Sequence, residues 1–342
     1  MNTELLAADA AGIARAGTIL RNGGLVGIPT ETVYGLAADA ANGAAVSRIF
    51  EAKGRPGDNP LIVHICALSQ LEQLVSDFPV QAQKLASAYW PGPLTIILPK
   101  KDGVPDEVTA GLPTVAVRFP SHPVAQAVIR EAGCPLAAPS ANSSGKPSPT
   151  TAAHVMNDLN GRIEAVLDGG DCGVGVESTV ITLAAERPRL LRPGGITPEQ
   201  LRAVLGEIEI DPAVTHQLAE GQQVLSPGMK YKHYAPNASV VLIKGSSAQY
   251  AAYVNSHADS GVYAMCFAED IPLLTVPYLA YGAQADAETQ ARLLFDCLRA
   301  FDRMQVQTVY AHCPSEDGIS LAVYNRMLRA AGFTVIECAD QK

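Results

Sequence analysis

Two patterns of hydrophobic residues, one typical of strands and one of helices, alternate along the first two hundred residues of the chain. Short apolar runs bounded by Gly, Pro or Asp are typical of buried strands, and apolar residues three to four positions apart are typical of amphipathic helices. The segment 5–22 has the helical spacing, ends at Gly23-Gly24 and predicts the first helix. The same patterns predict strands at 25–28, 61–65, 94–98, 115–117 and 136–138, a strand pair at 165–167 and 179–183, and helices near 44–52, twice before about residue 89, from about 123 and after 150.

The periodic pattern weakens after residue 205 and returns at residue 239. Residues 206–237 include "SPGMKYKHYAP" and predict an interdomain linker. Beyond it the pattern predicts a smaller α/β unit, with strands at 240–243, 261–266 and 306–311, a long helix at 287–304, further helices and a last strand. We therefore expect a first domain over 1–205, a linker over 206–237 and a small domain over 238–342.

The alternation of strands with helices indicates α/β domains. Several connections are too short for the helical crossover that parallel neighbours need, so we expect a mixed sheet in the first domain. With 342 residues, of which 48% are hydrophobic and 17% charged, the chain can bury a core in each of two domains.

The charge and cysteine content narrow the class of protein. The net charge is −9, and neither half has the basic excess of a nonspecific nucleic-acid binder. Seven cysteines are scattered without a C-x-x-C pair, which is typical of reduced thiols in a cytoplasmic protein. The N-terminal sequence lacks a secretory signal and no apolar run reaches the length of a membrane span, so we expect a cytoplasmic protein that does not bind membranes.

The familiar phosphate-binding motifs do not match. Gly145-Lys146 looks like part of a P-loop, but Ser140 stands where the first glycine belongs and Pro147 replaces the Ser or Thr. No cluster has metal-ligand spacing, and no local motif indicates a covalent nucleophile. These absences favour catalysis by positioning and charge neutralisation.

Loops that follow the predicted strands are dense in small polar residues held by Pro and Gly. Ligands of open α/β sheets bind at such strand ends. Cations combined with hydroxyls and amides suit a phosphorylated ligand together with a small carboxylate. The residues concerned are Thr30, Glu31, Thr32, Tyr34, Lys53, Arg55, Asn59, His64, Arg118, Ser140, Asn142, Ser143, Ser148, Ser178, Thr179 and Arg192.

The stretch "KGRPGDN" places Lys53 and Arg55 two positions apart among helix breakers. We interpret the breakers as keeping this loop out of a helix so that both cations turn toward one anion. Taken singly, a Pro- and Ser-rich loop is more often only a turn, His64 a core histidine, and Glu31 or Lys53 a structural or solvated side chain. The functional interpretation depends on the recurrence of such loops at strand ends.

Seven ordered motifs carry a family resemblance: "PTETVYGL", "KGRPGDNPL", "WPGPLT", "VAVRFP", "PSANSSGKPSPT", "ESTV" and "LRPGG". Over about residues 12–200 they resemble the YrdC-type catalytic domain of L-threonylcarbamoyladenylate synthases. The stretch "SPGMKYKHYAP" with the small domain after it resembles the longer, two-domain form of these enzymes. The resemblance implies a YrdC-like twisted mixed sheet with flanking helices and a smaller, Rossmann-like α/β domain.

The resemblance also implies an activity and its partners. Enzymes of this family form threonylcarbamoyl-AMP and pyrophosphate from ATP, L-threonine and bicarbonate, with Mg²⁺ carried by ATP. The product serves the threonylcarbamoyladenosine (t6A) modification of tRNA, so the downstream partners would be threonylcarbamoyl-transfer proteins.

Site residues follow from the same motifs, position by position. The resemblance implies a catalytic set around the nucleotide phosphates, further contacts to ATP that include a linker tyrosine, and a threonine pocket. The catalytic set is Lys53, Arg55, Ser140 and Asn142; the further ATP contacts are Asn59, Thr114, Ser148, Arg192 and Tyr231 or Tyr234; the threonine pocket is Thr32, His64, Arg118, Ser178 and the backbone of Ala138.

Two alternatives stay open at this stage. Carbamoyl-adenylate-forming enzymes of hydrogenase maturation share the catalytic fold but add an acylphosphatase-like region and paired zinc-binding cysteines, neither of which this sequence has. A nucleic-acid-binding module is the other alternative. The net charge of −9 and the lack of aromatic residues among the cationic loops argue against stable nucleic-acid binding as the main role.

The linker is expected to cover the active site. A passive tether needs only polar, flexible residues, whereas this linker holds two tyrosines and three potential cations within residues 230–234. The alternative is that these side chains only pack the two domains together. The family resemblance favours a lid over ATP.

Overall fold

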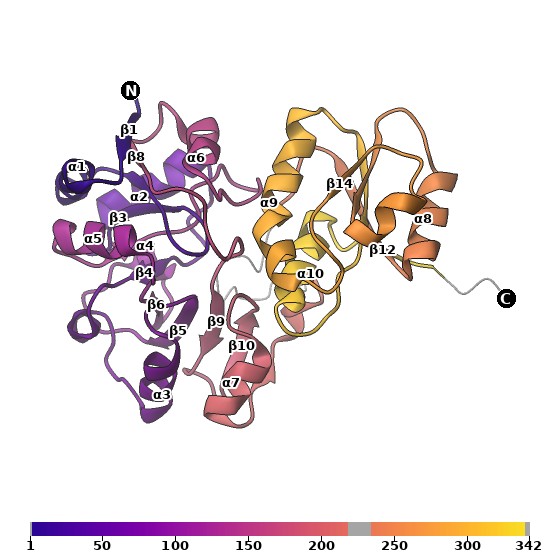
Figure 1. Cartoon of the computed structure of the whole chain (residues 1–342). Coiled ribbons are helices and arrows are strands. Elements are labelled where there is room, and N and C mark those ends of the chain that lie inside the picture. Colours follow the sequence, from indigo (N-terminus) through magenta and orange to yellow (C-terminus); the bar gives the residue numbers. More distant parts are fainter. Residues whose placement is uncertain (1, 218–233, 339–342) are drawn as a thin grey trace. The chain divides into compact units, whose positions relative to one another are not determined.

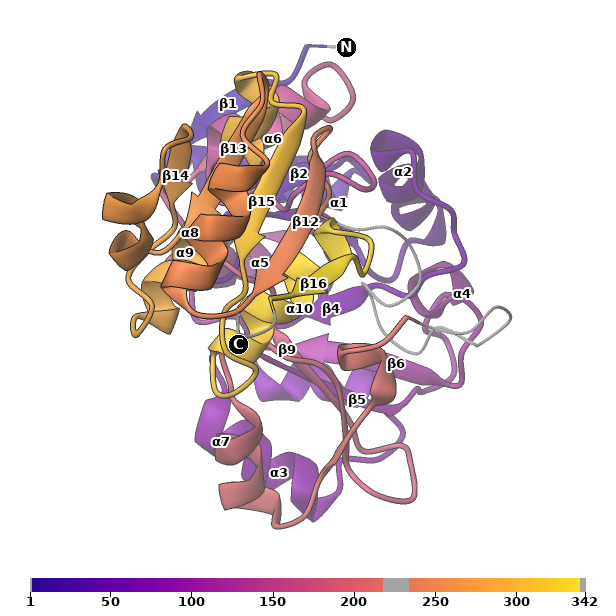
Figure 2. The ribbon, with the colours of Figure 1, turned by 90° about the vertical axis from the view of Figure 1, so that its right-hand side faces the viewer.

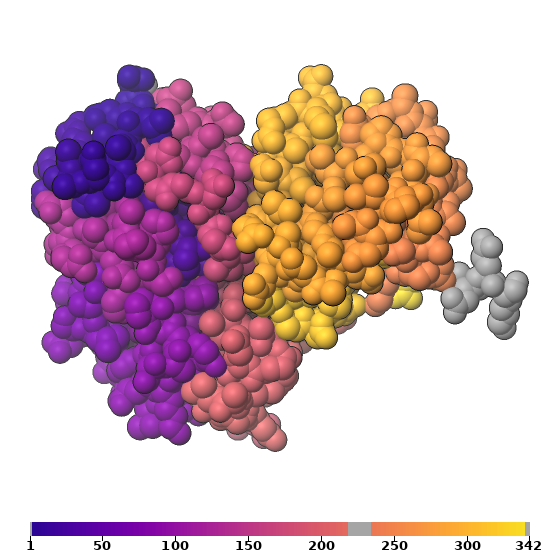
Figure 3. Space-filling view, in the orientation of Figure 1, coloured from indigo at the N-terminus to yellow at the C-terminus, as the bar shows by residue number. Residues whose placement is uncertain are grey.

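The computed structural model describes residues 2–217 and 234–338, which divide into two compact units. Of these residues, the first unit holds those up to 144 and 148–214, and the second holds 145–147, 215–217 and those from 234 onward. In Figure 1 the first unit runs from indigo to pink and the second from orange to yellow. Figure 3 shows one face of both units in space-filling form, with the same colours. The domain boundaries expected from the sequence stay a prediction.

A mixed sheet is the framework of the first unit, as the sequence predicts. Its described strands number eleven, in the order β1-β8-β2-β3-β7-β4-β6-β5-β9-β10-β11. The sheet contains parallel pairs such as β4 with β6 and antiparallel pairs such as β4 with β7. The strands are β1 (Glu4–Ala7), β2 (Val26–Ile28), β3 (Gly35–Asp39), β4 (Ile62–His64), β5 (Leu94–Pro99), β6 (Thr114–Arg118), β7 (Leu136–Ala137), β8 (Ala165–Asp168), β9 (Thr179–Thr182), β10 (Arg189–Arg192) and β11 (Glu209–Ile210).

Helices cover both faces of this sheet. Successive strand residues point to opposite faces, and in β8 Val166 joins one hydrophobic cluster while Ala165 and Leu167 join another. Helices α1 and α5 contribute to the second cluster, and α2, α3 and α6 to the first, so the sheet is the middle of three layers. The helices are α1 (Ala10–Arg21), α2 (Gly43–Lys53), α3 (Val80–Tyr89), α4 (Asp106–Thr109), α5 (Pro123–Ala132), α6 (Ala152–Leu159) and α7 (Pro198–Leu205), with 3₁₀ turns η1 (Leu68–Gln73) and η2 (Pro212–Val214).

Helix α2 leads directly into the cationic loop. Asn42 caps its start by accepting a hydrogen bond from Ala45 N, and Gly54 ends it with a left-handed φ of 64°. Only glycine adopts that conformation without strain, which explains the position of the break. Lys53 is the last helical residue, so the breakers act after Lys53 and leave only Arg55 in the irregular loop.

The first predicted helix is wrong at its start. The chain forms β1 at Glu4–Ala7, and α1 begins only at Ala10, with Asp9 as its cap. β1 pairs in parallel with β8, whose residues lie about 160 positions later in the sequence. This long-range pairing overrides the local helical pattern.

Two further details of the predicted strands differ. The segments 165–167 and 179–183 do not pair with each other, because β8 lies between β1 and β2 whereas β9 lies between β5 and β10. The strand β3 was not predicted. Its five residues, Gly35–Asp39, lie almost entirely in the core, and they follow the motif that we assigned to a loop.

The second unit is a parallel α/β sheet (Figure 2). Its described strands follow the order β14-β13-β15-β12-β16. β14 was not predicted, and within the predicted linker the structure has β11 and η2, while residues 218–233 lie outside the described part. The elements are β12 (Ser239–Lys244), α8 (Ser247–Ser256), β13 (Val262–Cys266), η3 (Ala268–Leu273), β14 (Tyr278–Ala280), α9 (Ala287–Arg303), β15 (Thr308–His312), α10 (Ser320–Ala330) and β16 (Val335–Glu337).

The described residues bear on two expectations, the lack of a membrane span and the reduced state of the cysteines. Their helices include none with the length and hydropathy that crossing a bilayer requires. All seven cysteines fall within the described residues, and each has a free thiol.

Candidate active site

Lys53 ties the loop after β7 to the end of α2. Its Nζ donates to the backbone oxygens of Ser140 and Asn142 at 2.5 Å each, and it lies 3.4 Å from Asn142 Oδ1. Ser140 Oγ donates to the same Asn142 Oδ1 at 2.5 Å. Lys53 is only 3% exposed, so these are charge-assisted bonds of a largely desolvated ammonium. The structure therefore brings three of the four predicted catalytic residues together, with Lys53 holding the loop that carries the other two.

Arg55, the fourth predicted catalytic residue, lies in the loop before β4. Its Nη2 donates to the backbone oxygens of Asn59 at 3.2 Å and Pro60 at 3.5 Å. Asn59 is fully buried, and neither polar atom of its amide has a hydrogen-bond partner among the described residues. Buried amides are nearly always hydrogen-bonded, so an unsatisfied one beside a cation points to a polar ligand.

Thr114 and Arg118 mark the two ends of β6. Four residues of a strand span about 13 Å, so the predicted ATP contact at Thr114 and the predicted threonine contact at Arg118 are well separated. β4 runs parallel to β6, and Asn59 precedes it at the end where Thr114 lies. Ala138 N donates to Ile62 O at 2.9 Å, in the middle of this span. Asn59, Thr114, Ala138 and Arg118 thus lie along a span that suits an elongated ligand.

Arg118 is the centre of the predicted threonine pocket. Its Nη1 donates to Thr32 Oγ1 at 2.8 Å, and its Nη2 lies 2.8 Å from Glu31 Oε1. Arg118 is 4% exposed, and its Nε and Nη2 lack an aligned hydrogen-bond acceptor among the described residues. A buried guanidinium with donors to spare matches the planar fork that carboxylates bind.

His64 lies opposite Arg118 in the register of β4 and β6. Its Nδ1 lies 3.2 Å from the backbone oxygen of Ile62. Burial, and next the charge of Arg118, lower the pKa of His64 to about 3. The imidazole is therefore neutral at pH 7 and adds no second positive charge to the pocket.

Ser178 and Arg192 are joined directly. Arg192 donates from Nε to Ser178 O at 3.0 Å and from Nη2 to Ser178 Oγ at 3.1 Å, and Thr95 Oγ1 lies 2.8 Å from the same hydroxyl. Gly194 passes so close that an added Cβ would come within 2.5 Å of Glu177 O and 2.6 Å of Ser178 C. The "LRPGG" motif therefore needs glycine there, because only a bare backbone fits against this segment.

Ser148 is fully buried, and its Oγ donates to the carboxylate of Glu177. Sequence reasoning missed Glu177 and Thr95. Glu177 was visible as the first residue of "ESTV", next to a predicted site serine. Thr95 carried no signal, because a threonine inside an apolar strand is ordinary.

Of the two linker tyrosines, the structure describes only Tyr234. Tyr231 lies outside the described residues. Tyr234 belongs to the second unit and is 5% exposed, with its ring centroid 5.3 Å from that of Phe295 and 5.9 Å from the guanidinium carbon of Arg326. The contact of Tyr234 with ATP stays a prediction.

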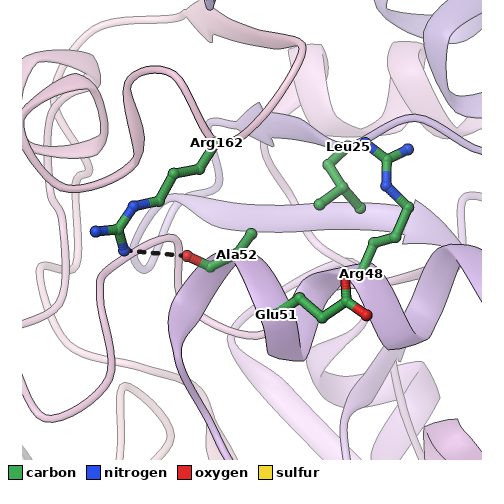
Figure 4. A pocket seen from close by; sticks show the side chains of 5 residues that line it. All are labelled: Leu25, Arg48, Glu51, Ala52 and Arg162. Carbon is green, nitrogen blue, oxygen red and sulfur yellow. Dashed lines mark hydrogen bonds between the residues drawn. The ribbon is translucent and has the colours of Figure 1, made fainter. Parts of the chain in front are cut away.

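A surface hollow of about 420 Å³ lies beside α2. Figure 4 shows Arg162 reaching across it to the backbone oxygen of Ala52, at 3.4 Å. Arg48 is paired with Glu164 at 2.5 Å. Both arginines thus contact protein acceptors, and we do not assign a ligand to this hollow. Its lining residues are Leu25, Arg48, Glu51, Ala52 and Arg162.

Family models match both parts of the chain. The model described as "Telomere recombination", which covers Sua5, YciO and YrdC proteins, matches residues 18–194. The model described as "Threonylcarbamoyl-AMP synthase, C-terminal domain" matches residues 196–332. The order of the two matches is the order that the resemblance implied.

Relatives of similar length match almost the whole chain. The threonylcarbamoyl-AMP synthase of Bacillus subtilis is 48% identical over 98% of this chain and 97% of its own length. The threonylcarbamoyl-AMP synthase of Pyrococcus abyssi is 45% identical over 94% of both chains. A crystal structure of P. abyssi Sua5 complexed with L-threonine matches with a TM-score of 0.90 and 42% identity, over 99% of this chain and 100% of that one.

These matches decide between the alternatives left open by the sequence. The relatives that share both parts of the chain are named synthases, and the match extends beyond the catalytic fold that hydrogenase maturation enzymes would share. The chain belongs to the family of threonylcarbamoyl-AMP synthases.

Proposed function

We propose that this chain forms threonylcarbamoyl-AMP and pyrophosphate from L-threonine, bicarbonate and ATP. The observation that carries the proposal is the buried Arg118, whose spare donors lie beside Thr32 and His64, in the same unit as the cluster that Lys53 at the end of α2 forms with Asn142 in the loop after β7. One region suits the carboxylate of an amino acid, and the other suits the phosphates of a nucleotide.

The reaction needs no covalent intermediate with the protein. The threonine nitrogen takes up CO₂ derived from bicarbonate, and an oxygen of the resulting N-carboxylate attacks the α-phosphorus of ATP in line. The bond to the leaving pyrophosphate breaks as the new P–O bond forms. The chain's task is to align two anions that repel each other and to neutralise developing charge.

The residues divide this work. Arg118 binds the threonine carboxylate, with Thr32, His64, Ser178 and the backbone of Ala138 around it. Lys53 fixes the loop of Ser140 and Asn142 through its bonds to their backbone oxygens, and that loop meets the phosphates. The further ATP contacts are Arg55, Asn59, Thr114, Ser148 and Arg192, with Tyr231 or Tyr234 from the linker.

Magnesium enters this proposal as an ion carried by ATP. The groups that we assign to the phosphates are guanidiniums, hydroxyls and amides, with the ammonium of Lys53 behind the loop that carries two of them, and such donors suit phosphate oxygens. Bound with ATP, Mg²⁺ neutralises phosphate charge. The chain's residues then orient the phosphate oxygens.

The same proposal covers the route of the product. A mixed anhydride of this kind hydrolyses in water, so a linker that covers the site would limit its loss before delivery. The expected receivers are proteins that transfer the threonylcarbamoyl group to tRNA. We place the protein in the cytoplasm, where free thiols persist.

An omission series tests the activity. The chain is incubated with Mg²⁺, ATP, bicarbonate and L-threonine, each left out in turn, and pyrophosphate is measured. We expect release only in the complete mixture. Release that is unaffected when threonine is omitted would overturn the proposal.

A further inference from the structure

Glu31 is a largely buried carboxylate to which the proposed function assigns no role. It is about 13% exposed at its side chain and lies in the loop between β2 and β3, where its backbone oxygen accepts from Val174 N at 2.8 Å. Its Oε1 lies 2.8 Å from Arg118 Nη2. Neither carboxylate oxygen has an aligned hydrogen-bond partner among the described residues.

The geometry of this pair is unusual for arginine and a carboxylate. A structural pair of this kind is commonly bidentate, with two parallel N–H···O bonds that satisfy both partners. Here Glu31 contacts Arg118 through one close approach, while Arg118 directs Nη1 to Thr32. Both partners therefore keep hydrogen-bonding capacity that a substrate with a carboxylate and an ammonium could use.

The groups that face Glu31 come from four elements. Arg118 ends β6, His64 ends β4, Ser121 and His122 directly precede α5, and Cys172 follows β8. Burial works to raise the pKa of Glu31, but Arg118 and nearby backbone N–H groups outweigh it, so the pKa lies below its ordinary value. Glu31 is thus an anion at neutral pH.

We propose that Glu31 binds the ammonium of L-threonine and accepts its proton before carboxylation. This inference rests on the proposed function, in which Arg118 binds the carboxylate of the same substrate. The two groups of an α-amino acid are attached to one carbon. A guanidinium and a carboxylate 2.8 Å apart can therefore each contact one of them.

The proton balance is simple. The substrate ammonium transfers one proton to a Glu31 oxygen, which leaves a neutral amine with a lone pair. That pair forms the N–C bond to CO₂, one C=O pair moves to oxygen, and the second amine proton leaves to solvent. When the substrate carboxylate neutralises Arg118, Glu31 loses its main stabilising charge while its burial remains, so its affinity for the proton rises.

The test compares Glu31→Gln and Glu31→Asp with the unaltered chain. Glutamine keeps the shape, but it has no negative charge to pair with the ammonium and cannot accept its proton. We expect Glu31→Gln to raise the KM for threonine about 10-fold or more, with the KM for ATP nearly unchanged. Its kcat should recover as the pH rises, because solvent then supplies the free amine. Glu31→Asp should keep partial activity.

A binding experiment separates this role from a purely structural one. The probes are L-threonine and its analogue in which a hydroxyl replaces the amino group, measured by calorimetry without ATP. The unaltered chain should prefer threonine about 10-fold or more, and Glu31→Gln should bind both about equally. If Glu31 only orients Arg118, the variant will lose affinity for both probes alike.

The matched control is Glu164→Gln, which removes a partly buried glutamate paired with Arg48 outside the site. This variant should leave the affinity for both probes and the pH profile of kcat unchanged. If the unaltered chain releases no threonine-dependent pyrophosphate, the proposed function fails. If it does, and Glu31→Gln keeps the normal KM, pH profile and preference for threonine, only the role of Glu31 is overturned.

Discussion

His64 and Arg118 lie opposite each other in neighbouring parallel strands, at the ends of β4 and β6. One is a buried imidazole and the other a buried guanidinium, and the second helps to keep the first neutral. The pocket therefore holds a single strong cation on these strands, which suits one carboxylate. The relationship also has a consequence for stability.

The stability of the first unit should contain a contribution from His64 that is lost in acid. The pKa of His64 is lowered from 6.5 to about 3, so between these values the unfolded chain binds the proton more readily than the folded one. The contribution is fully present above pH 6.5 and falls with decreasing pH, by at most about 1.4 kcal/mol per pH unit. Urea unfolding of the unaltered chain and of His64→Gln measures it. The unaltered chain should lose more stability than the variant between pH 7 and about pH 5, and equal losses would contradict the shift.

Arg118→Lys should weaken threonine binding selectively. A planar fork becomes a single ammonium, so the KM for threonine should rise about 10-fold while the KM for ATP changes much less. Steady-state kinetics with each substrate varied in turn gives both constants. Equal effects on the two substrates would contradict the assignment of Arg118 to the threonine carboxylate.

Arg55→Ala should lower turnover about 100-fold or more, through loss of a charge-assisted phosphate contact in a shielded site. The fold should survive, because Arg55 lies in a loop and is not part of the core. Arg15→Ala, which removes an exposed arginine paired with Glu4, is the control. Near-normal activity of the Arg55 variant would exclude it from the phosphate site.

Gly194→Ala should disturb the segment of Ser178. The added methyl would clash with Thr179 N and would meet Glu177 O and Ser178 C at 2.5 and 2.6 Å, and backbone cannot move aside as a flexible side chain can. We expect a lower kcat and a higher KM for threonine. Gly195→Ala is the matched control, because its nearest contacts are side-chain atoms of Pro93 and Val174 at 3.1 and 3.2 Å. If both variants behave alike, the close approach at Gly194 is not what the motif preserves.

Replacing Tyr231 and replacing Tyr234 should have different effects. Tyr234 is buried against Phe295, so Tyr234→Ala should lower the free energy of unfolding of the second unit by about 3 kcal/mol. Tyr231→Ala should leave stability unchanged, and under the lid hypothesis it should weaken ATP binding and increase leakage of AMP. Tyr278→Ala, at a residue 42% exposed, is the control. A chain truncated after Val214, which keeps β11 and η2 of the first unit, should show the same ATP defect. Full activity of both altered chains would reduce the linker to a tether.

Local pattern predicted most elements of the fold, because their signals are local. The strand at 61–65 is bounded by Pro60, and the helix near 44–52 ends at a glycine that adopts a left-handed conformation. β1 could not be predicted in this way, since the strand with which it pairs, β8, lies about 160 residues away. The expected pairing of 165–167 with 179–183 was wrong for the same reason, because the strands that neighbour these segments in the sheet lie far away in the sequence.

The candidate site, like the fold, could be predicted only in part. The motifs identified the loops, but they could not show what each side chain contacts. The motif around Lys53 gave no sign that its ammonium bonds to two backbone oxygens of the neighbouring loop, and the predicted role of Lys53 toward an anion stays a prediction. Glu31 was weighed as a structural or solvated residue, because its partner Arg118 lies 87 positions away and is brought near only by the sheet.

The most direct test of the account follows the carbon of bicarbonate. The chain is incubated with carbon-labelled bicarbonate, L-threonine, ATP and Mg²⁺, and the products are examined by mass spectrometry. The account predicts one labelled product that contains AMP and threonine joined through the labelled carbon, formed in equal amount with pyrophosphate. Pyrophosphate formed with unlabelled AMP alone, or a labelled adenylate that contains no threonine, would contradict it.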